Sequence, residues 1–511
     1  MSSFASFYSK TLLAVIFIKS IDIVRNLIIA SKIGVSNSAD IFSAISIIPE
    51  GIIILIGIDS LRGVVNSEYT SLISQSKLEI IQNSFNNLFK IILFLGIVLL
   101  ILLMFFKNNI VDMLLPGFDE AKKIKAYGVA QIIFPTIIMS SLIALFQAIY
   151  NSFKKFTFPV LVFSISSLTI LISILFPPYN NDIIYNLSFG MIFGNVLVLL
   201  VLTSNIRSLG LKFKIKGTGI DLTTKRILKS CAIVLPVVFF NQIYFYSRNF
   251  FASNYGEGSI ASISYAATVP NTIMVIAFGT IFGILVSNLS TSYTLSKGIE
   301  AKRLFTNAFK ILFFLFVPIV VCLVLFKIEI LKIVYLRGNL NLEDIEKISK
   351  PFVWEALGLL SWVAYTLPTS VFLAKKKYKM LAIIGSIMYS FGILLNYIFT
   401  HAFGYYGISV STFFTLGIYG IILIYFSRKF QGRYKDFLKP ILFIILSGLT
   451  TFLIGSFIIK QFAMRPYEAS FLENIVSLVF GCIIVSIVYL SLSQILKVNY
   501  LSNILNILKK K

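Results

Sequence analysis

Residues 86–106 read NNLFKIILFLGIVLLILLMFF, and this stretch decides the class of fold. It carries a single charged side chain, Lys90, near its beginning. A helix of about 20 mostly apolar residues is long enough to cross the hydrocarbon core of a bilayer. A helix also satisfies its own backbone hydrogen bonds, which lipid cannot do. The stretch is therefore predicted to be a transmembrane helix.

Comparable apolar runs recur along the whole 511-residue chain and leave no room for a soluble domain. The sequence is 57% hydrophobic and 13% charged, with a mean hydropathy of +0.90, whereas about a quarter of the residues in a soluble protein are charged. We expect an all-α polytopic membrane protein with about 14 transmembrane helices. The predicted spans are 8–31, 39–68, 86–106, 126–151, 157–176, 183–203, 226–253, 259–290, 306–326, 352–373, 380–400, 405–426, 438–459 and 474–494.

Lysine and arginine are distributed unevenly between the two sides of these spans. One set of alternate loops holds 26 Lys/Arg against 4 Asp/Glu, whereas the other set is nearly balanced. The basic loops are 69–88, 152–157, 204–229, 291–305, 374–379, 427–439 and the tail 495–511. Because loops rich in Lys and Arg stay in the cytoplasm, both termini are predicted to be cytoplasmic. The spread of these residues over many short loops argues against a nucleic-acid partner.

The chain repeats itself weakly with a period of about 220 residues. Three segment pairs match in the same order: 25–31 with 248–253, 87–91 with 307–311, and 154–156 with 376–378. Each copy holds six predicted helices, so we expect two pseudo-symmetric lobes related by an axis along the membrane normal. The predicted parts are an N-lobe 1–206, a cytoplasmic linker 207–225, a C-lobe 226–430, and a region 431–511 with helices 13 and 14 and a cytoplasmic tail.

Charged residues within the spans gather in the helices that open each repeat. Such groups usually face a water-filled cavity or a partner, and steps of three residues place Lys19, Asp22 and Arg25 on one helix face. The predicted cavity residues are Lys19, Asp22, Arg25, Asp40, Asp59, Arg62 and Arg248. The alternative is a set of structural ion pairs, in which Asp22 joins Lys19 or Arg25 and Asp59 joins Arg62.

Proline and glycine mark equivalent places in the two repeats. Pro49, which is followed by Glu50 and Gly51, interrupts the second predicted helix, and Pro270 interrupts the eighth. Broken helices at matching positions in two repeats indicate a binding site in many transporters. We therefore predict hinges at Pro49, Gly51 and Pro270; kinks that serve only packing are the alternative.

Catalytic and metal-binding patterns are not evident. Cys231, Cys322 and Cys482 are far apart in apolar runs, without metal-ligand spacing. The single histidine, His401, lies at a predicted helix end. A polyprenyl-linked glycan polymerase or ligase would need a large outer loop, whereas the longest one here, 327–351, resembles a solvated amphipathic segment. We expect a protein that is not an enzyme and that has no metal or cofactor.

Short motifs along nearly the whole chain resemble the MurJ/MviN lipid II flippases, within the multidrug/oligosaccharidyl-lipid/polysaccharide exporter superfamily. The motifs lie at 24–26, 39–42, 48–49, 115–119, 133–135, 252–253, 258–261, 265–266, 279–280, 337–338 and 404–407. The resemblance implies fourteen helices in two lobes, a cationic central cavity for the diphosphate and sugars, and a groove on helices 13 and 14 for the polyprenyl tail. It also implies that Arg25 and Asp40 occupy functional family positions and that Lys19 stands where the family often has arginine.

The sequence departs from the family pattern at three places. Ile53 stands where the family usually has arginine, Ala267-Thr268 replaces an Asp-Arg pair, and Asn26 replaces an aspartate. We expect Arg62 and Arg248 to replace the two missing cations. Arg25 and Arg248 would then form a pair, one from each lobe, with guanidinium forks that suit phosphate oxygens. The alternative is that Arg248 extends to the outer headgroups.

We therefore expect a flippase of the bacterial inner membrane that moves an undecaprenyl-diphosphate-linked saccharide, with lipid II as first choice. An O-antigen or capsule unit is the alternative substrate. A cation-coupled multidrug exporter is the alternative class, because the carboxylates would suit an acidic cavity. Membrane lipids are the other expected partners, the protein is expected to be monomeric, and the driving force, a membrane potential or an ion gradient, is left open.

Overall fold

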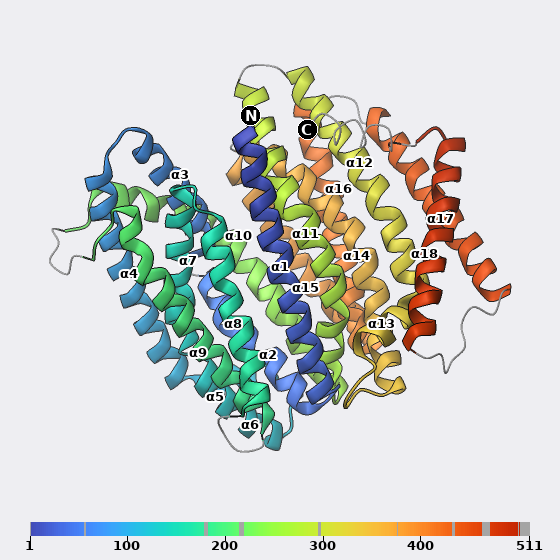
Figure 1. Ribbon diagram of the computed structural model, residues 1–511, viewed down its shortest axis with the longest axis horizontal. Coiled ribbons are helices and arrows are strands. Elements are labelled where there is room, and N and C mark those ends of the chain that lie inside the picture. Colours follow the sequence, from blue (N-terminus) through green and yellow to red (C-terminus); the bar gives the residue numbers. More distant parts are fainter. Residues whose placement is uncertain are drawn as a thin grey trace. The chain divides into compact units, whose positions relative to one another are not determined.

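In the computed structural model, the described residues form helices and short connections, without a strand among them (Figure 1). The structure describes residues 2–55, 58–177, 182–213, 219–294, 298–375, 377–431, 435–461, 471–498 and 500. The chain divides into two compact units, residues 1–261 and 262–511. The predicted lobe boundaries come from the sequence repeat and not from the compactness of the units, and they stay a prediction.

The first unit contains ten α-helices, two short 3-10 helices and the beginning of an eleventh α-helix, counted over the described residues. They are α1 (Ser2–Ile33), α2 (Asn37–Leu55), α3 (Ile58–Ser74), α4 (Leu78–Phe105), α5 (Lys107–Leu114), α6 (Glu120–Ile133), α7 (Thr136–Ser152), α8 (Thr157–Leu175), α9 (Ile183–Ser204), η1 (Asn205–Leu209), α10 (Leu222–Ala252), η2 (Ser253–Tyr255) and the first turn of α11 (Ser259–Thr294).

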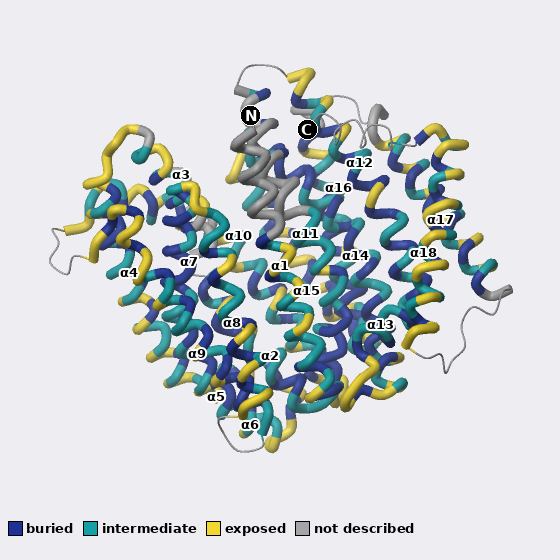
Figure 2. Tube along the Cα trace, in the orientation of Figure 1, coloured by how far each residue is buried: buried dark blue, intermediate teal, exposed yellow. Residues whose placement is uncertain are grey.

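The second unit continues α11 and adds the helices that follow it. They are α12 (Gly298–Leu325), α13 (Lys327–Tyr335), α14 (Leu342–Ala374), α15 (Tyr378–Phe403), η3 (Gly404–Tyr406), α16 (Gly407–Gln431), α17 (Lys435–Gln461) and α18 (Phe471–Ile495). Little of the last helix, α18, is fully buried: 17% of its most apolar stretch is buried inside the protein (Figure 2). A helix this apolar and this exposed suits a lipid environment.

The predicted multi-pass helical fold is confirmed. Over the described residues, every one of the fourteen predicted spans coincides with helix: 39–68 covers parts of α2 and α3, on either side of the undescribed residues 56–57, and 126–151 is divided into α6 and α7. Among the described residues, ten helical stretches are long and apolar enough to cross a membrane, or twelve if two bent pairs each count as one span. One of the ten, 378–427, contains α15 and most of α16.

Glycines bring α9 unusually close to α8 in the first unit. A methyl group added at Gly194 would lie 2.2 Å from Oγ1 of Thr169 and 2.8 Å from Cα of Ser166. One turn away, a methyl group at Gly190 would lie 2.9 Å from Cα of Ile170. Small residues spaced by four allow such close approach between membrane helices. This packing fixes α8, against which α1 in turn packs.

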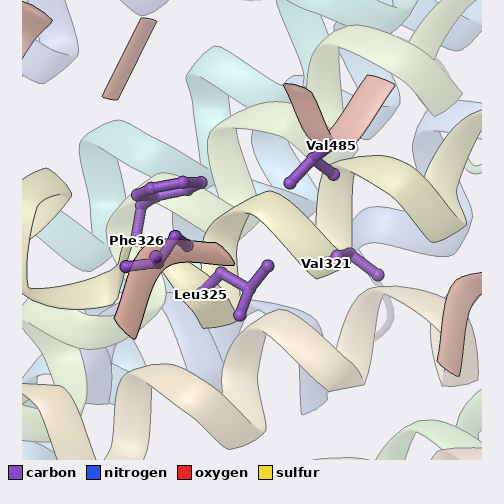
Figure 3. Packing of buried hydrophobic residues seen from close by; sticks show 5 residues of the cluster. Val321, Leu325, Phe326 and Val485 are labelled. Carbon is purple, nitrogen blue, oxygen red and sulfur yellow. The ribbon is translucent and has the colours of Figure 1, made fainter. Parts of the chain in front are cut away.

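An apolar cluster in the second unit joins α12, α17 and α18. Val321, Leu325 and Phe326 pack with Ile459 and Val485 (Figure 3). Two of the three cysteines, Cys322 and Cys482, pack against this cluster as small apolar side chains. The ring of Phe326 also lies against α18, where a methyl group on Gly481 would approach its Cζ to 2.0 Å.

Two expectations about local structure need correction. The predicted interruptions at Pro49 and Pro270 are absent, because α2 and α11 each continue through their proline. Neighbouring helices can compensate for the one backbone bond that such a proline removes. The segment 327–351, which is predicted to be an outer loop, is not fully solvated either: Glu329 and Lys332 on α13 are 4% and 6% exposed. Residues three apart share a helix face, and this face is turned inward.

Candidate functional site

A cluster of charged and polar side chains lies where α1 meets α8; we call it the α1 charge cluster, comprising Lys19, Asp22, Arg25 and Ser167. The Asp22 carboxylate lies 2.8 Å from Nζ of Lys19 and 3.5 Å from Nη1 of Arg25. Ser167 donates to Oδ1 of Asp22 at 2.6 Å and accepts from Nη1 of Arg25 at 2.9 Å. The predicted common face of Lys19, Asp22 and Arg25 is therefore present, and so is the ion pairing of Asp22.

Partial burial makes these interactions stronger than those of surface ion pairs. The side chain of Asp22 is 19% exposed and that of Arg25 is 24% exposed. Charges held away from bulk water interact at a lower effective dielectric constant, so the loss of one partner is felt by the others. Their number also matters: two cations share one carboxylate, which leaves the cluster with a net positive charge.

The second edge of the Arg25 guanidinium is held by a neutral group. Its Nε and Nη2 both donate to Oδ1 of Asn26, at 3.2 and 3.0 Å. A carboxylate or phosphate would accept these two bonds more strongly, because charge-assisted bidentate hydrogen bonds are stronger than neutral ones. Glu50 of α2 also acts electrostatically on Arg25. The edge of the Arg25 guanidinium formed by Nε and Nη2, which we call the fork edge, is thus occupied by a weak acceptor.

The structure places Asp40 at the beginning of another helix. The Asp40 side chain, 1% exposed, accepts from the backbone N–H of Gly258 at 2.7 Å and of Ala261 at 2.8 Å. In return, Glu257 accepts from the backbone N–H of Asn37 at 2.9 Å. The first turns of α2 and α11 therefore cap one another, and a carboxylate at a helix N-terminus is favourable. The predicted role of Asp40 as a cavity residue stays a prediction.

Arg248 lies on a different face of α10 from the residues that meet α2. Its guanidinium is 5.8 Å from the ring centroid of Phe245, an exposed side chain. Tyr246, which donates to the carbonyl of Ile48 in α2, precedes Arg248 by two positions. Two helical positions correspond to a rotation of about 200°, so Arg248 does not share the face that contacts α2. The predicted pairing of Arg25 with Arg248 stays a prediction.

Several predicted site residues lie outside the α1 charge cluster, and the side chains of two of them are not described by the structure. The side chains of Asp59 and Arg62 lie outside the described part of the structure. Glu355, a further carboxylate within a span, accepts a 2.7 Å bond from Ser409. Among the predicted hinge residues, Pro49, Gly51 and Pro270 are all buried, and their role as hinges stays a prediction.

The positions that lost family cations are packed as ordinary residues. Ile53 is 5% exposed in α2. The Thr268 hydroxyl donates to the carbonyl of Ser264 within its own helix, at 3.1 Å. Neither side chain therefore supplies the donor that an arginine would place there. Whether Arg62 and Arg248 replace these cations stays a prediction.

Sequence reasoning missed two residues of the site. Ser167 lies in an apolar stretch, 157–176, that gives no sign of a charged partner. Asn26 is part of the repeated segment and of a family-like motif, but neither pattern predicts that it accepts from Arg25. Serine hydroxyls in membrane helices commonly bond to their own backbone, and Ser164 and Ser173 do so. The side chain that instead bonds to another helix could not be distinguished from these by sequence.

The helical bundle, with partly buried charges inside it, is that of a multi-pass membrane protein. The chain matches the family model described as Lipid II flippase MurJ over residues 29–499, and it belongs to that family. It is 24% identical over 491 residues, 94% of each chain, to a probable lipid II flippase MurJ of Buchnera aphidicola subsp. Acyrthosiphon pisum. It is 22% identical over 323 residues, 61% of each chain, to a lipid II flippase MurJ of Burkholderia cenocepacia.

Solved structures share the fold. A lipid II flippase MurJ in an inward closed conformation superposes with a TM-score of 0.75 at 23% identity, covering 96% of this chain and 99% of the other. A multidrug resistance MATE family transporter in an inward-facing conformation gives 0.67 at 12% identity, covering 82% and 98%. The family model thereby confirms the expected family resemblance, and the solved structures show the same fold.

Proposed function

We propose that this protein moves lipid II from the cytoplasmic to the outer leaflet of the inner membrane by alternating access. Membership of the lipid II flippase family supports this substrate over an O-antigen or capsule unit. The observation that carries the proposal within this chain is the Arg25 fork, whose Nε and Nη2 bond to a neutral amide at 3.2 and 3.0 Å. A diphosphate can displace that amide and gain charge-assisted bonds.

The chemistry of the substrate explains why such a cluster is needed inside a membrane protein. A diphosphate and its sugars cannot enter hydrocarbon without losing their hydration, which costs several kcal/mol for each uncompensated polar group. Lys19, Arg25 and Ser167 offer donors that replace part of this hydration. The polyprenyl tail can remain in lipid throughout, because it is as apolar as its surroundings.

The abundance of carboxylates in the spans does not exclude an anionic substrate. Asp22 lies between two cations, Asp40 accepts two backbone N–H groups, and Glu355 accepts from Ser409. Carboxylates with such partners contribute less negative potential to a binding site than solvated ones. Glu50 is the carboxylate that acts on Arg25 from outside the α1 charge cluster.

The departures from the usual family pattern also balance in charge. Compared with that pattern, Ile53 and Thr268 remove two cations, while Asn26 and Ala267 remove two anions. The net charge of these positions is unchanged. A loss of cations alone would weaken diphosphate binding, whereas the paired loss leaves the electrostatic balance of the family intact. This balance favours the same substrate class over a cation-coupled drug exporter.

Both termini are proposed to be cytoplasmic, on the basis of 26 Lys/Arg against 4 Asp/Glu in one set of loops. Cysteine labelling tests this in a variant without the three native cysteines. A cysteine at Gly219, where an added side chain meets nothing within 4 Å, should be protected from an impermeant reagent applied outside. A cysteine at Glu343, an exposed position after α13, should react. The reversed result contradicts the proposed topology.

We also propose that the protein acts as a monomer.

The function itself is tested by replacement of a lipid II flippase in living cells. A bacterial strain depleted of its own flippase should grow and keep its shape when this chain is the sole source. Lysis with accumulation of lipid II on the cytoplasmic side, despite normal amounts of this protein in the membrane, would contradict the proposal. Restored O-antigen display without restored growth would support the alternative substrate.

A further inference from the structure

The side chain of Tyr246 on α10 enters the space beside Gly51 of α2. The Tyr246 hydroxyl donates to the backbone carbonyl of Ile48 at 3.0 Å. A methyl group added at Gly51 would lie 2.0 Å from Oη and 2.6 Å from Cζ of this tyrosine. It would also lie 2.8 Å from Oε1 of Gln242, one turn earlier on α10. The absence of a side chain at Gly51 therefore lets Tyr246 reach the α2 backbone.

The sequence of α2 explains why a tyrosine is accepted here. Pro49 lies inside the helix and has no N–H, so the helix lacks one of its backbone hydrogen bonds at this turn. Two residues later, Gly51 leaves the backbone uncovered. The hydroxyl of Tyr246 donates from outside the helix to the carbonyl of Ile48. This carbonyl lies in the same turn as that of Ile45, which is the one that Pro49 leaves without its helical donor. One hydrogen bond and one close contact thus join α2 to α10.

The contact is also linked to the α1 charge cluster through Glu50. This residue stands between Pro49 and Gly51 and acts electrostatically on both Tyr246 and Arg25. A shift of this turn of α2 relative to α10 would therefore change the potential at Arg25. The contact is well placed to couple helix movement to the state of the diphosphate-binding group.

We propose that Tyr246 is a positioning residue that holds α2 against α10 at Pro49, and that this contact opens during each transport cycle. The inference rests on the proposed alternating-access function and names a part of the machinery that performs it. A single neutral hydrogen bond suits a contact that has to break and re-form, because its net contribution is modest. The reciprocal caps around Asp40, with a buried carboxylate on two N–H groups, are stronger.

Substitutions at the two residues should act through the same contact. Gly51→Ala forces the phenol aside and so removes the bond to Ile48, which Tyr246→Phe removes directly. Each change should alter the transport rate by about two- to tenfold, and the double variant should be no worse than Gly51→Ala alone. Independent, multiplying effects would overturn the proposal. Gly63→Ala is the matched control, because an added methyl group there meets nothing within 4 Å.

Photo-crosslinking then tests placement and opening separately. An azidophenylalanine at position 246, in the full-length protein reconstituted in vesicles, should crosslink on irradiation to residues 48–51. Irradiation should abolish translocation of labelled lipid II, measured against the unirradiated sample. A crosslink elsewhere, or full transport after crosslinking to 48–51, would overturn the proposal. If the unirradiated protein and the wild type both fail to move lipid II, the proposed function fails, while the crosslink still reports the contact.

Discussion

The hydroxyl of Ser167 on α8 donates a 2.6 Å hydrogen bond to the carboxylate of Asp22 on α1. The same oxygen accepts from Arg25 at 2.9 Å, so one small side chain joins the anion and the cation of the cluster. Because α8 is itself fixed against α9 by Gly190 and Gly194, the hydroxyl gives the guanidinium a defined position. An arginine side chain otherwise has many rotamers, and fixing it before the substrate arrives lowers the entropy cost of binding.

Ser167→Ala should therefore weaken transport without unfolding the protein. We expect an increase in the apparent KM for lipid II of about two- to tenfold, because a typical hydrogen bond contributes about 0.5–1.5 kcal/mol net. Ser167→Thr, which keeps the hydroxyl, should restore most of the affinity. Ser164→Ala is the control, since that hydroxyl bonds to the backbone of its own helix. Equal effects at 164 and 167 would remove the special role of Ser167.

Asn26→Asp should reduce the affinity for the diphosphate. The new carboxylate would accept from Nε and Nη2 of Arg25 in place of the neutral amide oxygen, and a substrate phosphate would then have to displace an ion pair. Transport at limiting lipid II should fall several-fold, with less effect at saturating lipid II. Asn26→Gln keeps the neutral amide and should act more mildly. Faster transport in the aspartate variant would contradict the role given to this fork edge.

Asp40→Ala should destabilise the protein more than the loss of an exposed cap. The Asp40 carboxylate serves two backbone N–H groups and is almost fully buried, so its removal should cost about 2–4 kcal/mol. Asp119 is an exposed N-cap of α6 that accepts from the N–H of Lys122. Its replacement by alanine should lower the stability of the fold by about 1 kcal/mol. Thermal unfolding in detergent compares the two. A smaller loss for Asp40→Ala than for Asp119→Ala would contradict the capping role.

Asp221, the N-cap of α10, should make stability depend on pH in the acid range. Burial opposes its ionisation, but hydrogen bonds from Thr224 and Asn87 outweigh that effect and lower the pKa of the carboxyl below its usual value. A lowered folded-state pKa means that this stabilisation is complete above the unfolded pKa of about 3.9 and is lost as pH falls below it.

Thermal unfolding of the wild type and of Asp221→Asn from pH 7 to pH 3 tests this assignment. The wild type should be the more stable protein at pH 7, and the difference should narrow as pH falls below about 4. A constant difference over this range would show that the ionised carboxylate contributes nothing. The measurement is independent of transport, since Asp221 lies before α10 and outside the α1 charge cluster.

The helices could be predicted from sequence because lipid imposes one requirement on every span, a long apolar run with its backbone bonds satisfied. The charged face of α1 followed from spacing alone. The proline signal was misleading, because it suggested an interruption at Pro49, through which α2 continues. Ser167 could not be found either, since its role depends on how α8 packs against α1. The capping role of Asp40 could not be predicted either, because its partners Gly258 and Ala261 lie over 200 residues away in sequence.

The central claim is that Arg25 binds the head group of lipid II while the protein carries it across the membrane. The most direct measurement is translocation of labelled lipid II in vesicles that contain either the wild type or Arg25→Lys. Lysine keeps the charge but cannot form the two-pronged fork. We predict that the wild type moves lipid II and that the lysine variant, folded and equally abundant, loses at least tenfold in rate. Equal rates for the two proteins would contradict the account.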